Sequence, residues 1–90
     1  MRELVISCET NEQATDVTRE LLRIGYIHGS SGWSKKIEQG KYKDFIWTQV
    51  FTDSWNEIEY CNHDDNAISY DDFMAMYSKK AQPLSFDGLF

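Results

Sequence analysis

The first 25 residues change their hydrophobic period from two to about 3.6, and this change restricts the fold more than any other feature. Apolar side chains alternate over residues 3–8, which predicts a half-buried strand. From residue 11 they recur at helical spacing, and the predicted buried stripe of this helix holds Ala14, Val17, Leu21 and Ile24. A strand joined directly to an amphipathic helix predicts a sheet with a helix packed on one face.

The two ends of this first helix carry recognisable signals. Thr10 and Gln13 have the spacing of a capping box, so the helix is expected to begin near residue 11. Gly25 suits the position after the last helical residue, because glycine adopts positive φ without steric cost. Four charged residues of the helix are expected mostly on its solvent-exposed face: Asp16, Arg19, Glu20 and Arg23.

The middle of the chain predicts a hairpin that follows a polar connection. Residues 29–32 read as a loop, and residues 33–43 form a polar stretch. Residues 44–52 are rich in β-forming side chains and predict a strand, while residues 57–61 alternate again. The turn-forming residues at 53–56 join these two segments into an antiparallel hairpin.

A second helix is expected from Ser69. Asp71 and Asp72 lie in its first turn, where acidic side chains complement the helix dipole. The predicted apolar face of this helix holds Phe73, Met76 and Tyr77. The expected fold is therefore α+β, with a small antiparallel sheet of about three strands and two helices in the order β-α-β-β-α.

The chain has 90 residues, which is enough for one small domain, and we place this domain at residues 1–80. Residues 81–90 form an apolar C-terminal tail that is expected to dock on the domain or on a partner. The apolar side chains of this end of the chain are Leu84, Phe86, Leu89 and Phe90.

The balance of charge argues against some classes of protein. Nine basic and fifteen acidic residues give a net charge of −6, and the acidic excess lies after residue 45. Binding of double-stranded nucleic acid needs a basic surface and is not expected. No apolar run is long enough to span a membrane, and the N-terminus lacks an apolar signal core, so we expect a cytoplasmic protein. The acidity serves either solubility or a basic partner.

Candidate metal and catalytic patterns are incomplete. Residues 65–73 resemble the second half of a calcium-binding EF-hand loop, but this alignment places Cys61 and His63 where oxygen ligands are needed. Cys8 and His28 would complete four soft ligands, although structural zinc sites usually consist of two closely spaced pairs. Both cysteines are expected to be reduced and buried, with nothing nearby in sequence to activate a thiol. We therefore expect no metal, no cofactor and no enzymatic activity.

The loop before Trp33 offers a candidate nucleotide-binding site. Its glycines let backbone N–H groups approach a phosphate, and its serines and the following lysines add donors and positive charge. Trp33 offers a ring on which a base would stack. The candidate phosphate- or nucleotide-binding residues are Ser30, Ser31, Trp33, Lys35 and Lys36. The alternative interpretation is a flexible connector with solvated lysines, because the spacing of a P-loop is absent.

Three short motifs resemble those of a loose group of small bacteriophage-encoded proteins. They are Gly25-Tyr26, Ser30-Ser31-Gly32 and the late Ile68-Ser69-Tyr70-Asp71-Asp72-Phe73 segment, within a resemblance that spans residues 3–77. A tryptophan is common in this group where the present chain has His28. Most of these proteins have no known function, and some small phage proteins disarm host enzymes or defence systems. The resemblance implies a setting inside a bacterial host.

Two functional hypotheses follow. The first is a small acidic protein that inhibits or modulates a host protein, for example one of a defence system, by direct contact. Its candidate partner-binding residues are Trp55, Glu57, Glu59, Asp64 and Asp65, with Trp55 serving either as an exposed anchor or as a lid on the core. The second hypothesis is a module that binds or sequesters a nucleotide or cyclic nucleotide through the loop at residues 29–36, with the nucleotide held by an oligomer.

Overall fold

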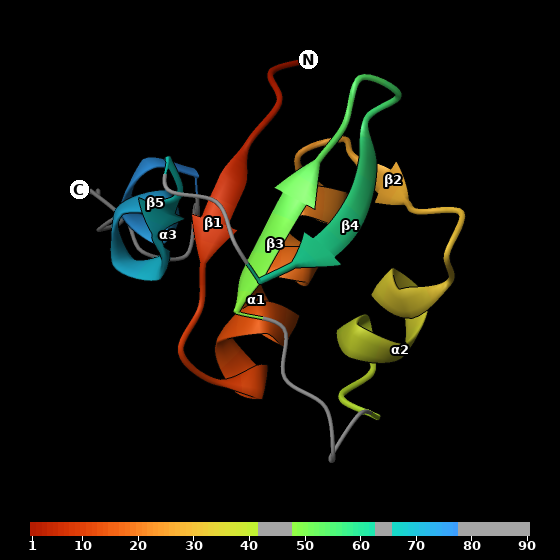
Figure 1. Ribbon diagram of the computed structural model, residues 1–90, viewed down its shortest axis with the longest axis horizontal. Helices are drawn as coiled ribbons and strands as arrows, with labels where there is room; N and C mark the ends of the chain where they lie inside the picture. The colour runs from red at the N-terminus through yellow and green to blue at the C-terminus, as the bar shows by residue number, and fades with distance from the viewer. Residues whose placement is uncertain (42–47, 63–65, 78–90) are drawn as a thin grey trace, which may run out of the picture.

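The structure of the protein, a computed structural model, describes residues 1–41, 48–62 and 66–77 (Figure 1). Its strands are β1 (Val5–Ser7), β2 (Ile27–His28), β3 (Gln49–Thr52), β4 (Glu57–Cys61) and β5 (Ile68–Ser69). Its helices are α1 (Asn11–Arg23), α2 (Trp33–Glu38) and α3 (Tyr70–Tyr77). The strands form one sheet in the order β2-β4-β3-β1-β5, and α1 lies behind this sheet with α2 and α3 to either side (Figure 1). The expected α+β class is confirmed.

The sheet is mixed, whereas about three antiparallel strands were expected. The predicted hairpin is present, since β3 and β4 pair antiparallel, and β3 also pairs antiparallel with β1. The two outer strands pair in parallel instead, β5 with β1 and β2 with β4. Each outer strand has only two residues. A segment of this length is too short to show a hydrophobic period, which is why the sequence pattern did not reveal a five-stranded sheet.

The signals at the ends of α1 act as predicted. The Thr10 side chain accepts a hydrogen bond from the Gln13 N–H at 3.0 Å. The Gln13 side chain in turn accepts from the Glu9 N–H at 2.7 Å, one residue earlier than in a standard capping box. Gly25 follows the helix with a φ of 120°, a conformation that favours glycine.

A third helix, α2, occupies the segment that was expected to be only a polar connection. Ser34 and Ile37 are fully buried, three residues apart on one face of this helix, and Thr15 of α1 donates its hydroxyl to the Ile37 carbonyl at 2.8 Å. Ile37 is the one fully buried large apolar residue of this helix, and Trp33 packs partly on the core, so the segment has too few apolar residues to show a helical stripe in the sequence. The predicted strand at 44–52 is described only from β3 onward, because residues 42–47 lie outside the described ranges.

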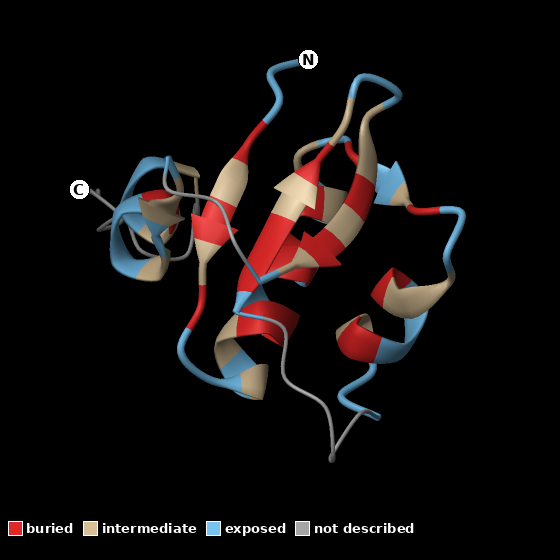
Figure 2. Ribbon diagram, in the orientation of Figure 1, coloured by how far each residue is buried: buried red, intermediate tan, exposed pale blue. Residues whose placement is uncertain are grey.

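The core lies between the sheet and α1, where buried residues concentrate in Figure 2. Its fully buried side chains include Ile6, Val17, Leu21, Val50 and Phe73. Two expectations on helical faces were wrong. Glu20 is buried, because its carboxylate pairs with Arg23, and Arg23 also donates to the Tyr77 carbonyl at 2.8 Å. Met76 is 57% exposed, because α3 presents only one side to the sheet.

In the described ranges, no helix has the length and apolar character needed to cross a bilayer. The apolar tail at 81–90, the lysines that follow α3, and the acidic residues Asp64 and Asp65 lie outside those ranges.

Candidate functional site

The tip of the β3–β4 hairpin, residues 53–56, is a tightly bonded turn. One Asp53 carboxylate oxygen accepts the backbone N–H groups of Trp55 at 2.9 Å and Glu57 at 3.0 Å. The Asp53 carbonyl accepts from the Asn56 N–H at 3.0 Å. Asn56 has a φ of 63°, a left-handed conformation that asparagine tolerates better than most residues. The sequence therefore builds a turn whose backbone geometry is set by its own side chains.

Trp55 projects from this turn and is 74% exposed. Of the two interpretations left open by the sequence, the structure supports the exposed one, since Trp55 does not cover the core. A tryptophan that faces solvent leaves a large apolar area in water, and tryptophan is enriched at the energetic centres of protein interfaces. Because the turn is held by three internal hydrogen bonds, little backbone entropy remains to be lost when this side chain is captured.

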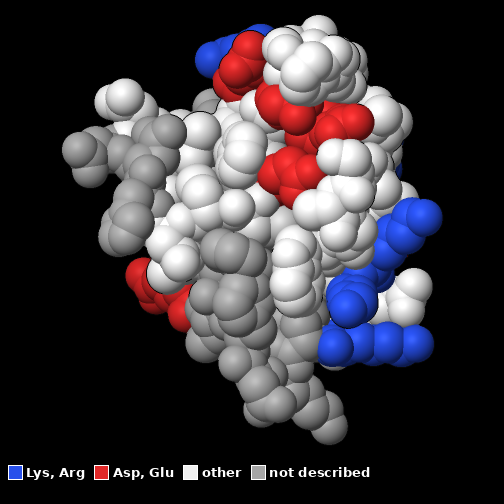
Figure 3. All heavy atoms as spheres, turned by 45° about the vertical axis from the view of Figure 1, so that its right-hand side comes forward, with Lys and Arg blue, Asp and Glu red and all other residues white. Residues whose placement is uncertain are grey.

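Two of the predicted partner-binding acids lie along β4. Glu57 and Glu59 alternate with the buried residues Ile58 and Tyr60, so both point to the sheet face opposite the core. Figure 3 shows acidic side chains gathered on this side of the molecule, with a separate group of basic side chains below them. Asp64 and Asp65, the remaining predicted acids, lie outside the described residues.

Glu59 does not face solvent freely, because it holds the loop that precedes α2. The Ser31 hydroxyl donates to one Glu59 carboxylate oxygen at 2.5 Å, and the Ser31 N–H points to the other at 3.4 Å. A Cβ atom built on Gly29 would approach the Ile58 carbonyl and the Glu59 carboxylate closer than 3.0 Å. Gly29 is therefore needed because two backbone segments meet there without room for a side chain.

This contact bears directly on the candidate nucleotide site. The Ser31 donors that would hold a phosphate are occupied by a carboxylate, which would repel an anion at the same place. Ser30 and Lys35 are exposed, and the Lys36 Nζ lies 5.2 Å from the centre of the half-buried Trp33 ring. The loop does lead directly into a helix, contrary to our expectation, but α2 has only six residues. Nucleotide binding stays a prediction, and it requires Glu59 to move away from Ser31.

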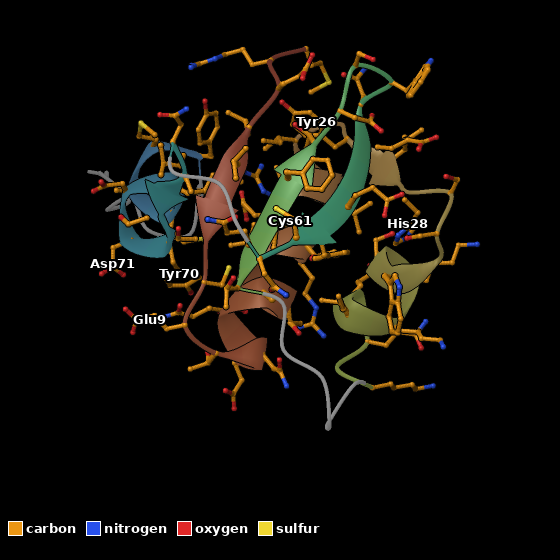
Figure 4. The ribbon with its side chains drawn as sticks, in the orientation of Figure 1. Glu9, Tyr26, His28, Cys61, Tyr70 and Asp71 are labelled. Carbon is orange, nitrogen blue, oxygen red and sulfur yellow. The ribbon has the colours of Figure 1, made fainter. Side chains whose placement is uncertain are left out.

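A chain of polar side chains that sequence reasoning missed links β2 to α2. His28 Nδ1 lies 2.7 Å from the Ser34 hydroxyl, and His28 Nε2 lies 3.4 Å from a Glu38 carboxylate oxygen (Figure 4). The Ser34 oxygen also accepts the Gly29 N–H at 3.2 Å. A carboxylate, an imidazole and a hydroxyl in series are the components of a nucleophilic triad. Here, however, Ser34 is fully buried, so its hydroxyl cannot reach a substrate and the series instead fastens α2 to the sheet.

The spacing of Ser34 and Glu38, four residues apart on one helical face, was the available signal for this arrangement. It was not usable, because the segment was not recognised as a helix. The same error concealed the role of His28, which the sequence suggested only as a distant metal ligand.

A small open depression of about 110 Å³ lies where the parallel strands β1 and β5 end and α1 and α3 begin. Its lining residues are Ser7, Glu9, Gln13, Ser69, Tyr70 and Asp71, of which Glu9, Tyr70 and Asp71 lie together in Figure 4. Ser69 caps α3 by accepting the Asp72 N–H at 3.0 Å, as the sequence predicted. The depression is smaller than the sites that enclose small-molecule ligands, which span roughly 300–1,000 Å³.

The chemistry of the thiols and phenols does not point to catalysis. Burial, with the neighbouring charge of Asp16, raises the pKa of the Cys8 thiol to about 12. Burial and a hydrogen bond to Asp16, at 2.8 Å, raise the pKa of Tyr70 to about 12. Both groups therefore stay neutral near pH 7, and a neutral thiol is a poor nucleophile. Cys8 and Cys61 are unpaired, and in the described part of the chain no three histidine, cysteine or acidic side chains gather as metal ligands.

Comparisons with protein-family models, with curated proteins and with solved structures find no match for this chain. The interpretation of the surface therefore depends on its own chemistry.

Proposed function

We propose that this chain is a binding protein that inhibits or modulates a partner protein by direct contact through the hairpin tip, residues 53–56. The observation that carries the proposal is Trp55, 74% exposed on a turn that its own hydrogen bonds hold in shape. An exposed aromatic side chain on a rigid turn loses little conformational entropy when it enters a pocket of a partner. This combination favours tight binding from a small contact area.

The charge beside the tip indicates what surrounds that pocket. Glu57 follows the turn directly and lies half-buried on the sheet face opposite the core, and Asp53 lies within the turn itself. A partner that receives Trp55 would meet these acids at the rim of the interface. Basic residues around the partner's pocket would steer the encounter and raise the association rate, an effect that salt screens.

The setting of the proposed contact is a bacterial host cell. The resemblance to small phage-encoded proteins supports a host protein as the partner, for example a component of a defence system. An inhibitor of this kind needs no catalytic groups of its own, and the buried Ser34 and the high pKa of Cys8 are compatible with that mode of action.

The test is capture of partners from a bacterial lysate by tagged wild-type protein and by the Trp55→Ala variant. The matched control is Met76→Ala, since Met76 is also exposed and apolar but lies on α3, which packs beside β1 and β5. We expect a protein that is captured by the wild type and by Met76→Ala, and whose capture falls by at least about 30-fold in Trp55→Ala, the loss of a typical interface anchor. Equal capture by all three proteins would overturn the proposal.

A second measurement tests the rim. Glu57→Lys should slow association with that captured protein most strongly at low salt, and the difference from wild type should shrink as salt is added. If the Glu57→Lys variant associates as fast as wild type at low salt, the acidic rim takes no part in recognition.

A further inference from the structure

Two groups of charged side chains with opposite sign share one side of the molecule without neutralising each other. Glu57 is an acidic residue of β4, and Lys35 and Lys36 are basic residues of α2, a helix that packs against β4. Figure 3 shows acidic and basic groups on this side, separated by uncharged surface. The ion pairs found among the described residues join Arg23 to Glu20 and His28 to Glu38, so they use neither Glu57 nor the two lysines.

An exposed apolar residue lies beside the acidic group in the sheet. Ile27 is 53% exposed on β2, the edge strand that pairs with β4 and continues through the loop into α2. Ile27 is paired with Glu57 across these two parallel strands, so the two side chains share a face. The surface therefore combines an acidic part, an exposed isoleucine and a basic part, which we call the mixed face.

We propose that the mixed face binds the mixed face of a second copy of this chain, forming a symmetric dimer. A two-fold rotation reverses the order of the charges, so it places Glu57 of one copy towards the lysines of the other, twice per dimer. A self-complementary pattern of this kind suits a surface on which both signs of charge are unpaired.

Other classes of partner fit this pattern less well. A nucleic acid or an anionic membrane would be attracted to Lys35 and Lys36 but repelled by Glu57 on the same side. A uniformly basic protein would be attracted to Glu57 but repelled by Lys35 and Lys36 on the same side. A second copy satisfies both parts at once and is present wherever the chain is made.

The dimer does not depend on the proposed contact through Trp55, which projects from the hairpin tip. Glu57 belongs to both proposed contacts, so the two proposals are separated by Trp55 and Lys35, each of which belongs to only one of them. The Trp55→Ala variant should keep the mass of the wild type in solution while losing the partner protein. If the Trp55→Ala variant still captures the partner protein but differs from the wild type in its mass in solution, Trp55 belongs to the self-association surface. That result would overturn the assignment of the mixed face.

The experiment measures the mass of the purified full chain in solution by sedimentation equilibrium. We expect a species of twice the chain mass of 10.6 kDa at about 0.01 M salt, and the monomer at about 1 M salt, where the screening length falls to roughly 3 Å. A protein that stays monomeric at about 1 mM concentration and low salt overturns the proposal.

Charge reversal identifies the surface. Lys35→Glu and Glu57→Lys should each be monomeric at low salt, because each places like charges together twice in the dimer. The two variants mixed in equal amounts should form a heterodimer, since all four charged positions are then complementary. The double variant that carries both changes should dimerise by itself. Circular dichroism and urea unfolding of each variant confirm that the fold is kept.

Two outcomes contradict this assignment. Dimers that persist in both single variants would show that the charges of the mixed face are not at the interface. A mass that grows beyond two copies as concentration rises would show a head-to-tail contact that does not close, in place of a two-fold one.

Discussion

The loop that enters α2 and the tip of the β3–β4 hairpin are both short polar turns that contain serine and lie at or beside a tryptophan. Their environments differ completely. The loop is enclosed, with Gly29 against β4 and Ser31 bonded to Glu59, and Trp33 packs partly on the core. The tip is shaped by hydrogen bonds within the turn, its Asn56 carbonyl accepts one further bond from the Ile27 N–H of β2 at 2.9 Å, and it leaves Trp55 in solvent. Similar turn chemistry therefore holds the fold together at one place and leaves a tryptophan exposed at the other.

The strongest test of this difference is Gly29→Ala in the enclosed loop. The added Cβ meets backbone and carboxylate atoms that cannot both retreat, so we expect a loss of about 3 kcal/mol in the free energy of unfolding. Urea unfolding, followed by circular dichroism, measures this loss of stability. Gly40→Ala is the control: its φ of 72° strains alanine by about 1–2 kcal/mol, but no atom lies within 4 Å of the new Cβ. Equal losses in the two variants would show that the loop is not tightly enclosed.

Ser34→Ala tests the polar series that fastens the loop to α2. It removes a fully buried hydroxyl that bonds both His28 and the Gly29 N–H, leaving a donor without its partner. We expect the free energy of unfolding to fall by about 1–3 kcal/mol. Ser31→Ala, which removes an exposed hydroxyl from the same loop, should cost less than about 1 kcal/mol. If the Ser34→Ala and Ser31→Ala proteins are equally stable, the polar series of Glu38, His28 and Ser34 does not contribute to the stability of the fold.

The buried thiol of Cys8 predicts a loss of stability at alkaline pH. Its pKa is about 12 in the folded protein and near 9.0 when unperturbed, so between these values the folded state binds the proton more strongly. The stability present below about pH 9 is therefore lost progressively as the pH rises towards 12. Cys8→Ala should show a weaker dependence of the unfolding free energy on pH over about pH 8–10. Identical slopes in the variant and the wild type would refute this role for Cys8.

The smallest effect on stability is expected at the tip. Trp55→Ala removes a side chain that is 74% exposed, so the free energy of unfolding should change by no more than about 0.5 kcal/mol. Urea unfolding of Trp55→Ala and of Gly29→Ala under the same conditions compares the stability losses at the two turns. A loss of more than about 1 kcal/mol at Trp55 would show that its ring covers part of the core, and the contrast between tip and loop would disappear.

Much of the fold could be predicted because its signals are local. The strand before α1, the cap at Thr10, Gly25 after the helix, the β3–β4 hairpin and the cap at Ser69 all depend on neighbouring residues. The two-residue outer strands and the short helix α2 could not be predicted, since each is stabilised by contacts with segments that are distant in the chain. The burial of Glu20 beside the exposed Arg23 was missed because the environment of this pair includes α3, far along the chain.

The sequence by itself determined the α+β class and the acidic charge, because composition and short-range periodicity carry this information, and it named Trp55 as a candidate anchor without deciding whether its side chain is exposed. Only the tertiary structure decided which turn is enclosed and which is open. Glu59 became the partner of Ser31, and Ser34 became a buried link to His28, because strand pairing brought β2 and β4 together. Exposure and charge partners are properties of packing between distant segments, so no local pattern could separate Trp33, held against the core, from Trp55, held out in solvent.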